Sequence, residues 1–336
     1  MGSIMKAMIL NRHSPIESSP LELSETAAPE PKRGEIRIKI EACGICHTDL
    51  HIIEGELPVS HFPLIVGHQI VGSVHKCGTG AQRFAIGDMV GVPWLNRTCG
   101  KCPYCLGGNE NLCEDIRFTG YHQSGGYAQY ITVGEKFAYR ISRTFSAVKA
   151  APLLCAGIIG YRSLVLSGVK KGERLALYGF GATAHIALQV ARWMGAEVSV
   201  FSRGETHRRL ARKLGAVWTG APDKKPPSKV DRAIIFAPAG RLVPIALENL
   251  RRGGTLAIGA VWLDEIPQLD YQRHLFGEKK VISVTASTRR DGEDFLRIAA
   301  KIPVKITTEV FPLGEANYAL QLLKAGKIDG AGVLEI

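Results

Sequence analysis

A strand, a glycine-rich turn, a helix and a second strand follow one another between residues 173 and 203. This stretch reads ERLALYGFGATAHIALQVARWMGAEVSVFSR, and its two apolar runs flank a turn and an amphipathic helical segment. Such an arrangement predicts a βαβ unit, in which the helix joins two parallel strands. Further apolar runs at 230–240, 253–262 and 280–287 alternate with helical patterns. We therefore expect an α/β fold with a parallel, doubly wound sheet.

The turn itself has the pattern G-x-G-x-x-A, formed by Gly179, Gly181 and Ala184. The first glycine permits a tight turn, the second lets the backbone approach a pyrophosphate, and the small third residue lets the helix pack on the sheet. The amino end of the helix then offers free N–H groups to phosphate. Between a strand and a helix, this pattern predicts a dinucleotide site rather than a turn that binds nothing.

The residues that end the second strand bear on the choice of dinucleotide. A carboxylate there would bind the adenosine ribose and favour NAD(H), but the chain has Ser202 and Arg203 at the strand end. A hydroxyl and a guanidinium both suit a phosphate, and Arg208 lies one turn into the next helix. We expect NADP(H) to be favoured over NAD(H).

The first third of the chain has a different pattern. Short alternating runs such as 34–44 and 125–133, separated by glycine-rich turns, indicate a β-rich domain. After about residue 290 the chain returns to a helix, a strand and a second helix. We predict a β-rich domain at 1–155, a cofactor-binding domain at 156–290 and a return to the first domain at 291–336.

Four cysteines in one short loop have metal-ligand spacing. The loop CGKCPYCLGGNENLC reads C-x2-C-x2-C-x7-C, with the thiols at Cys99, Cys102, Cys105 and Cys113. Four thiolates can close a tetrahedral shell around zinc, and a closed shell indicates a structural metal. The alternative is two disulfides, which require an oxidising compartment.

The composition narrows the class of protein. The 336 residues carry a formal net charge of +11, but lysine and arginine are scattered, so we expect solvated surface charge and no nucleic-acid partner. No apolar run is long enough for a membrane span, and the start MGSIMKAMIL is not a signal peptide. We expect a cytoplasmic protein that does not bind membranes.

Several stretches together resemble the zinc-dependent medium-chain alcohol dehydrogenases. They are GICHTDLH, PLIVGHQ, the four-cysteine loop, AAPLLCAGI, the glycine-rich turn and the closing GKIDGAGVLEI, and the resemblance runs nearly from end to end. It implies a β-rich, GroES-like catalytic domain with a Rossmann cofactor domain. It also implies two zinc ions per subunit, a small-molecule substrate, and a homodimer or homotetramer.

The resemblance assigns a catalytic zinc to Cys46, His68 and Cys155, a ligand set that leaves one coordination position open. Zinc at such a position polarises an alcohol or carbonyl oxygen. By the same resemblance Asp49 orients His68, Thr48 takes the substrate proton, and His51 passes it to solvent.

Further roles follow for the cofactor and the substrate. The resemblance assigns His47 and Arg289 to the cofactor pyrophosphate, and Leu57 and Trp94 to the substrate pocket. Leu57 stands where relatives that prefer very small alcohols have tryptophan, so larger or aromatic substrates become plausible. The chain also departs from many relatives at Gln69, where they have glutamate directly after the zinc histidine.

The expected reaction is reversible oxidation of a primary or secondary alcohol with NADP(H) and zinc. Two alternatives stay open. One is a zinc-independent quinone or enoyl reductase of the same superfamily, and the other is a zinc-loop protein that binds nucleic acid.

Overall fold

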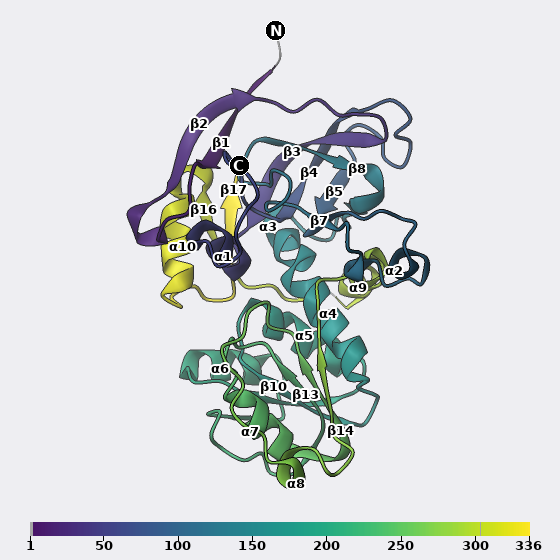
Figure 1. The fold of residues 1–336 in the computed structure, drawn as a ribbon, viewed down its shortest axis with the longest axis vertical. Coiled ribbons are helices and arrows are strands. Elements are labelled where there is room, and N and C mark those ends of the chain that lie inside the picture. The colour runs from purple at the N-terminus through teal and green to yellow at the C-terminus, as the bar shows by residue number, and fades with distance from the viewer. Residues whose placement is uncertain (1–2, 303) are drawn as a thin grey trace. The chain divides into compact units, whose positions relative to one another are not determined.

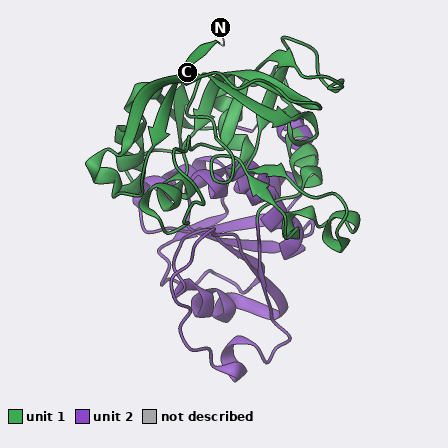
Figure 2. Ribbon diagram, turned by 45° about the horizontal axis from the view of Figure 1, so that its top comes forward, with its two compact units in different colours: residues 1–155, 286–296, 306–336 green, residues 156–285, 297–305 purple. Residues whose placement is uncertain are grey.

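The computed structural model describes residues 3–302 and 304–336, which form two compact units (Figure 2). Unit 1 consists of Met1–Cys155, Ala286–Leu296 and Ile306–Ile336, and unit 2 of Ala156–Thr285 and Arg297–Lys305. The mixed α/β fold class, with a β-rich GroES-like part and a Rossmann-type part, is confirmed.

The compact units differ from the predicted domains on the C-terminal side, where the chain leaves unit 2 at Thr285 and contributes 297–305 to it again. The cause is helix α9 (Arg289–Lys301). Its first residue, Arg289, is hydrogen-bonded to Glu110 of unit 1. Its last residue, Lys301, lies over the ring of Trp193 in unit 2. A single boundary at residue 290 cannot describe a helix whose two ends pack on different units.

Unit 1 is built on a seven-stranded sheet with the order β16-β17-β3-β4-β5-β9, in which β8 also pairs with β3. The sheet strands are β3 (Glu35–Gly44), β4 (Gln69–Cys77), β5 (Met89–Val92), β8 (Tyr130–Gly134), β9 (Tyr139–Arg140), β16 (Thr308–Pro312) and β17 (Ala331–Glu335). Two small pairs accompany it, β1 (Ile4–Leu10) with β2 (Leu21–Ala27) and β6 (Leu95–Arg97) with β7 (Arg117–Phe118). The helices of unit 1 are α1 (His47–Glu54), α2 (Pro103–Leu106), α3 (Ala147–Ala150) and α10 (Ala316–Lys324), with the 3-10 turns η1 (Ile16–Ser18), η2 (Glu110–Leu112), η3 (Glu135–Phe137), η4 (Ala151–Leu154) and η5 (Leu313–Glu315).

Strand β3 shows both the success and the limit of the alternation pattern. Ile36, Ile38 and Ile40 are buried in the core of unit 1, as alternation predicts. Arg37 is also buried, although it lies on the face where a charged side chain is expected to be exposed. Its guanidinium pairs with Glu30 and lies over the ring of Tyr130, so the charge is compensated.

Unit 2 contains a six-stranded parallel sheet in the order β12-β11-β10-β13-β14-β15. Strands β10, β13 and β14 of this sheet are labelled in Figure 1. Its strands are β10 (Arg174–Tyr178), β11 (Glu197–Phe201), β12 (Trp218–Gly220), β13 (Val230–Ile235), β14 (Leu250–Ile258) and β15 (Lys280–Ser283), and its helices are α4 (Ala156–Ser167), α5 (Ala182–Trp193), α6 (Glu205–Lys213), α7 (Leu242–Asn249) and α8 (Tyr271–His274). The strand order reverses between β10 and β13, which is where open α/β sheets bind ligands at the carboxyl ends of the strands.

Within the described part of the chain, no single helix has the length and apolar character needed to cross a bilayer. The neighbouring helical segments Ala147–Leu154 and Ala156–Ser167 satisfy that test only when a bent pair is allowed, and then by length and composition alone.

Candidate metal centres and cofactor turn

Helix α1 positions most of the polar residues around the first candidate metal centre. Cys46 precedes the helix in extended conformation, and its backbone N–H donates to Asp49 Oδ2 at 2.9 Å. This bond satisfies one of the free N–H groups at the helix start. Gly55 ends the helix with a φ of 87°. Thr48 and Asp49 are fully buried, whereas His47 is exposed.

His68 comes from a different segment, just before strand β4. Its Nδ1 lies 2.9 Å from Asp49 Oδ1, and since a carboxylate only accepts, the ring donates. His68 Nε2 is buried and makes no hydrogen bond. Buried polar atoms are rarely left without a partner, so the unpaired nitrogen indicates that a ligand binds to His68.

The sulfur atoms of Cys46 and Cys155 lie within 4.8 Å of each other and of a ring nitrogen of His68. Because Nδ1 is engaged by Asp49, the available ring nitrogen is Nε2. Two thiolates and an imidazole match the preferences of zinc, and a three-residue set leaves a fourth position for substrate. The donor set therefore fits the metal that the family resemblance implies.

The charges within this cluster are strongly coupled. A hydrogen bond from the Cys155 thiol lowers the pKa of Cys46 well below its ordinary value, and the same bond raises the pKa of Cys155. Burial opposes protonation of His68, but the carboxylate of Asp49 outweighs it and raises the pKa of His68 to about 10. The lowered pKa of the Cys46 thiol suits a metal ligand, because the sulfur has to lose its proton before it binds zinc.

The four-cysteine loop forms the second candidate centre. Its four sulfur atoms also lie within 4.8 Å of one another. Backbone N–H groups point at the sulfurs, with Cys102 N 3.3 Å from Cys99 Sγ and Cys105 N 3.5 Å from Cys102 Sγ. Hydrogen bonds from the N–H groups of Lys101 and Cys102 lower the pKa of Cys99 to about 6. All eight cysteines of the chain are free thiols, so the alternative of two disulfides does not describe this loop.

A carboxylate inside this loop ties it to helix α9. Glu110 is buried, and its two oxygens accept from Arg289 Nε at 3.0 and 2.9 Å, while Arg289 Nη2 lies 2.6 Å from Glu110 Oε2. The Arg289 guanidinium also lies over the ring of Phe137. The arginine expected to contact pyrophosphate is therefore held by a residue that the sequence analysis did not single out.

The residues expected to move the proton lie on and just after α1. Thr48 Oγ1 is 3.7 Å from Cys46 Sγ, so its hydroxyl borders the metal-ligand cluster. His51 Nδ1 pairs with the carboxylate of Glu56. The turn at Gly55 folds Glu56 back onto the helix, and Leu57 N donates to His51 O at 2.9 Å. A glycine followed by a carboxylate at a helix end is a signal that could have identified Glu56.

The two residues expected to line the substrate pocket, Trp94 and Leu57, contact different parts of unit 1. The ring of Trp94 lies 4.9 Å from that of His68 and 5.1 Å from that of Phe118, measured between centroids. Leu57 is half-buried against the core of unit 1. The hydroxyl of Tyr121 donates to Pro58 O at 3.1 Å and so holds the segment next to Leu57. Gln69 is buried, and its amide donates to Ile45 O at 3.3 Å.

The glycine-rich turn lies between β10 and α5 in unit 2. Gly179 has a φ of 90°, and a Cβ there would meet Ala237 N at 2.9 Å. A Cβ at Gly181 would meet nothing within 4 Å, so the backbone borders open space there. Ala184 is fully buried in α5. The three positions thus have the properties that a pyrophosphate-binding turn requires.

At the tip of β11, Ser202 is buried with its hydroxyl 3.4 Å from His207 Nδ1, and Arg203 is exposed. Arg208 Nη1 donates to Ser202 O at 2.6 Å and Arg203 O at 2.8 Å. The guanidinium of Arg208 also pairs with Glu205. Arg208 therefore braces the strand tip, which leaves Arg203 as the cation that faces solvent.

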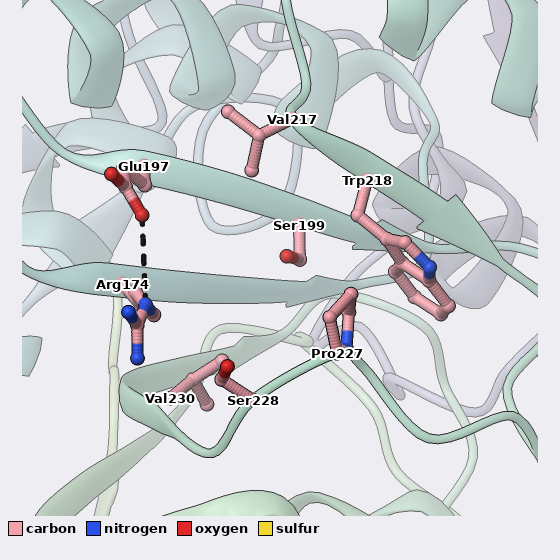
Figure 3. A pocket seen from close by; sticks show the side chains of 8 residues that line it. All are labelled: Arg174, Glu197, Ser199, Val217, Trp218, Pro227, Ser228 and Val230. Carbon is pink, nitrogen blue, oxygen red and sulfur yellow. Dashed lines mark ion pairs between the residues drawn. The ribbon is translucent and has the colours of Figure 1, made fainter.

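A pocket of about 230 Å³ occurs elsewhere on unit 2 (Figure 3). Trp218, Pro227 and Ser199 surround it, with the Arg174–Glu197 ion pair at one end. Arg174, Glu197 and Trp218 are the first residues of their strands, so the pocket lies at the amino ends of the parallel sheet. The glycine-rich turn follows the carboxyl end of β10, and this pocket is therefore not part of the candidate cofactor site.

Comparisons with known proteins agree with this arrangement. The family model described as "Alcohol dehydrogenase GroES-like domain" matches residues 32–143, and the model described as "Zinc-binding dehydrogenase" matches residues 182–301. A probable alcohol dehydrogenase AdhA of Mycobacterium tuberculosis is 48% identical over 99% of this chain and 97% of its own length. An alcohol dehydrogenase of Geobacillus stearothermophilus is 36% identical over 99% of this chain and its own full length.

Among solved structures, a CAD from Helicobacter pylori complexed with NADP(H) superposes with a TM-score of 0.88 at 26% identity, covering 100% of this chain and 99% of that one. The resemblance found in the sequence is confirmed by these matches, which extend over both units and include a relative nearly half identical from end to end. The chain belongs to the zinc-dependent medium-chain alcohol dehydrogenases and is an oxidoreductase of the alcohol dehydrogenase class.

Proposed function

We propose that the protein interconverts primary or secondary alcohols with their aldehydes or ketones, using NADP(H) and a zinc ion held by Cys46, His68 and Cys155. The observation that carries this proposal is the convergence of two thiols on the buried, unpartnered Nε2 of His68. Zinc in such a site supplies a Lewis acid that polarises the substrate oxygen.

The proton steps fall to residues of the chain. The hydroxyl of Thr48, which borders Cys46 Sγ, accepts the proton of the alcohol, and His51 passes it toward solvent. The carboxylate of Glu56 orients the His51 ring, because it pairs with Nδ1 of that ring. The nicotinamide cofactor, when bound, would supply or take up the hydride that the substrate carbon exchanges.

The four-cysteine loop holds a second, structural zinc in this proposal, since four thiolates leave no open position. The exposed Arg203 and the hydroxyl of Ser202 at the tip of β11 support a preference for NADP(H). We propose a reducing compartment such as the cytosol, supported by the eight free thiols. A homo-oligomer, dimer or tetramer, is part of the same proposal.

Metal analysis combined with a substrate panel tests this function. The purified protein should contain two zinc ions per chain and should oxidise medium-sized and aromatic alcohols faster with NADP than with NAD. Cys155→Ser should lose one zinc and nearly all turnover. The matched control is Cys77→Ser, because this half-buried thiol donates to Phe84 O at 3.7 Å and belongs to neither metal-ligand cluster.

The same experiment separates the alternative enzyme class. A zinc-independent quinone or enoyl reductase would retain turnover in Cys155→Ser and would reduce quinones or enones in preference to simple aldehydes. Either result would refute the proposed function.

A further inference from the structure

The carboxylate of Asp49 has three hydrogen-bond donors, and two of them belong to candidate metal ligands. Oδ1 accepts from the ring of His68 at 2.9 Å, and Oδ2 accepts from the backbone N–H of Cys46 at 2.9 Å. The third donor is the hydroxyl of Tyr127, 3.1 Å from Oδ2. Because Asp49, His68 and Tyr127 are all fully buried, water is not at hand to replace a missing donor.

Packing and backbone bonds fix Tyr127 in this place. Its N–H donates to Val66 O at 3.0 Å, and its carbonyl accepts from Met8 N at 2.8 Å. Its ring packs directly on Gly67, the residue before His68. A Cβ at Gly67 would lie 2.3 Å from the Tyr127 ring, and the φ of 96° there also favours glycine. Tyr127 thus supports the His68 segment by packing and by a hydrogen bond.

We propose that Tyr127 is a positioning residue for the metal ligand His68, acting through the carboxylate of Asp49. The proposal rests on the proposed function for the metal at this centre. The Tyr127 hydroxyl and the Cys46 N–H both donate to Oδ2 of Asp49. These two bonds fix the plane of the Asp49 carboxylate and therefore the direction in which its Oδ1 accepts from the His68 ring. Partners of metal-bound histidine orient the ring and strengthen it as a ligand.

The hydroxyl keeps its donor role under ordinary conditions. Burial, together with the nearby charge of Asp49, raises the pKa of Tyr127 well above its ordinary value. The residue therefore remains a neutral phenol, which can donate to a carboxylate.

Tyr127→Phe removes the hydroxyl and keeps the ring that packs on Gly67. Outer partners of metal ligands typically contribute about 10- to 100-fold in metal affinity. Tyr127 lies one bond further out than Asp49, so we expect about a tenfold faster release of one zinc per chain to a chelator. With cobalt at the catalytic centre, the visible ligand-field absorption should shift, because the geometry of the His68 ligand changes.

The matched control is Tyr139→Phe. Tyr139 is a buried tyrosine of the same unit, and its hydroxyl makes no hydrogen bond. This variant should release zinc like the wild type and should leave the cobalt spectrum unchanged. The second zinc, in the four-cysteine loop, is an internal control for Tyr127→Phe and should be released at the wild-type rate.

The outcomes distinguish this inference from the proposed function. If the wild type binds two zinc ions but Tyr127→Phe releases them as the wild type does and has the same cobalt spectrum, Tyr127 does not position His68. If Tyr127→Phe releases both zinc ions faster to the same degree, its effect is on the fold as a whole, and the inference is overturned. A wild type whose first centre binds no metal would instead overturn the proposed function.

Discussion

Replacing Arg203 by alanine should weaken NADPH binding and leave NADH binding nearly unchanged. Arg203 is exposed at the tip of β11, and its side chain makes no hydrogen bond or ion pair with the described residues. The neighbouring Arg208, in contrast, is engaged by two backbone carbonyls and by Glu205. A phosphate on the adenosine ribose would therefore meet the guanidinium of Arg203 first. NADH lacks that phosphate and should not depend on this residue.

The magnitude follows from the exposure of Arg203. A hydrogen bond between charged groups contributes about 1.5–3 kcal/mol net. Immobilising a long, exposed side chain costs about 0.5–1.5 kcal/mol on binding. The difference is roughly 1.4 kcal/mol, which corresponds to about a tenfold increase in the dissociation constant for NADPH. The effect should shrink at high salt, because an exposed ion pair is screened.

Fluorescence titration of both reduced cofactors against wild type and variant measures this effect. Arg209→Ala is the matched control, since it removes the same charge from an exposed position on helix α6. The reasoning fails if the wild type already binds NADH more tightly. It also fails if Arg203→Ala and Arg209→Ala change the NADPH dissociation constant equally, which would mean that only net charge matters.

Three further predictions concern stability and substrate choice. Cys99→Ser should lower the melting temperature, because a closed metal site contributes folding free energy. Cys155→Ser should abolish turnover at a nearly unchanged melting temperature. If differential scanning calorimetry shows the reverse, the structural and catalytic metal sites have been exchanged. Leu57→Trp should lower kcat/KM for benzyl alcohol at least tenfold relative to ethanol, because overfilling a pocket costs about 1–3 kcal/mol. If the ratio of the two kcat/KM values does not change, Leu57 does not contact the substrate. Burial alone would raise the pKa of Glu173, but the hydrogen bonds from Arg232 and from the N–H of Lys170, together with the charges of Arg232 and Arg251, outweigh burial and lower the pKa below 4.5. The ion pair with Arg232 therefore stabilises the fold above that pH, and the benefit is lost as the pH falls through the lowered pKa. Glu173→Gln should therefore lower the free energy of unfolding, measured in urea, by about 1–3 kcal/mol at pH 7 and by progressively less below pH 4.5. If the loss of stability is as large at low pH as at pH 7, the ion pair does not stabilise the fold in this way.

The fold of unit 2 could be predicted because its signals are local. The turn around Gly179 lies within one βαβ unit, and each of its positions has a requirement that follows from its neighbours in the chain. The four-cysteine loop is local in the same sense, because all four ligands fall between Cys99 and Cys113. Short-range geometry decides both features, so a pattern in the sequence is enough to predict them.

The remaining parts of the candidate site depend on contacts between distant residues. Tyr127 reaches Asp49 across 78 positions, and Arg289 reaches Glu110 across 179. Neither pair has a spacing that a periodic pattern could reveal. Arg37 gives the same lesson in the core, since its burial depends on the position of Glu30 rather than on the alternation of strand β3.

The pairing of Arg289 with Glu110 limits how this arginine can serve a cofactor. Glu110 is 6% exposed, and breaking the pair would leave a buried carboxylate without its cation, at a cost of several kcal/mol. A new bond to phosphate would contribute about 1.5–3 kcal/mol, which does not offset that cost. The guanidinium has a third nitrogen, however, and only Nε and Nη2 are bound to Glu110. The two N–H groups of Nη1 and the second N–H of Nη2 remain for a phosphate contact while the ion pair stays intact, so this residue supports the four-cysteine loop whether or not a cofactor is bound.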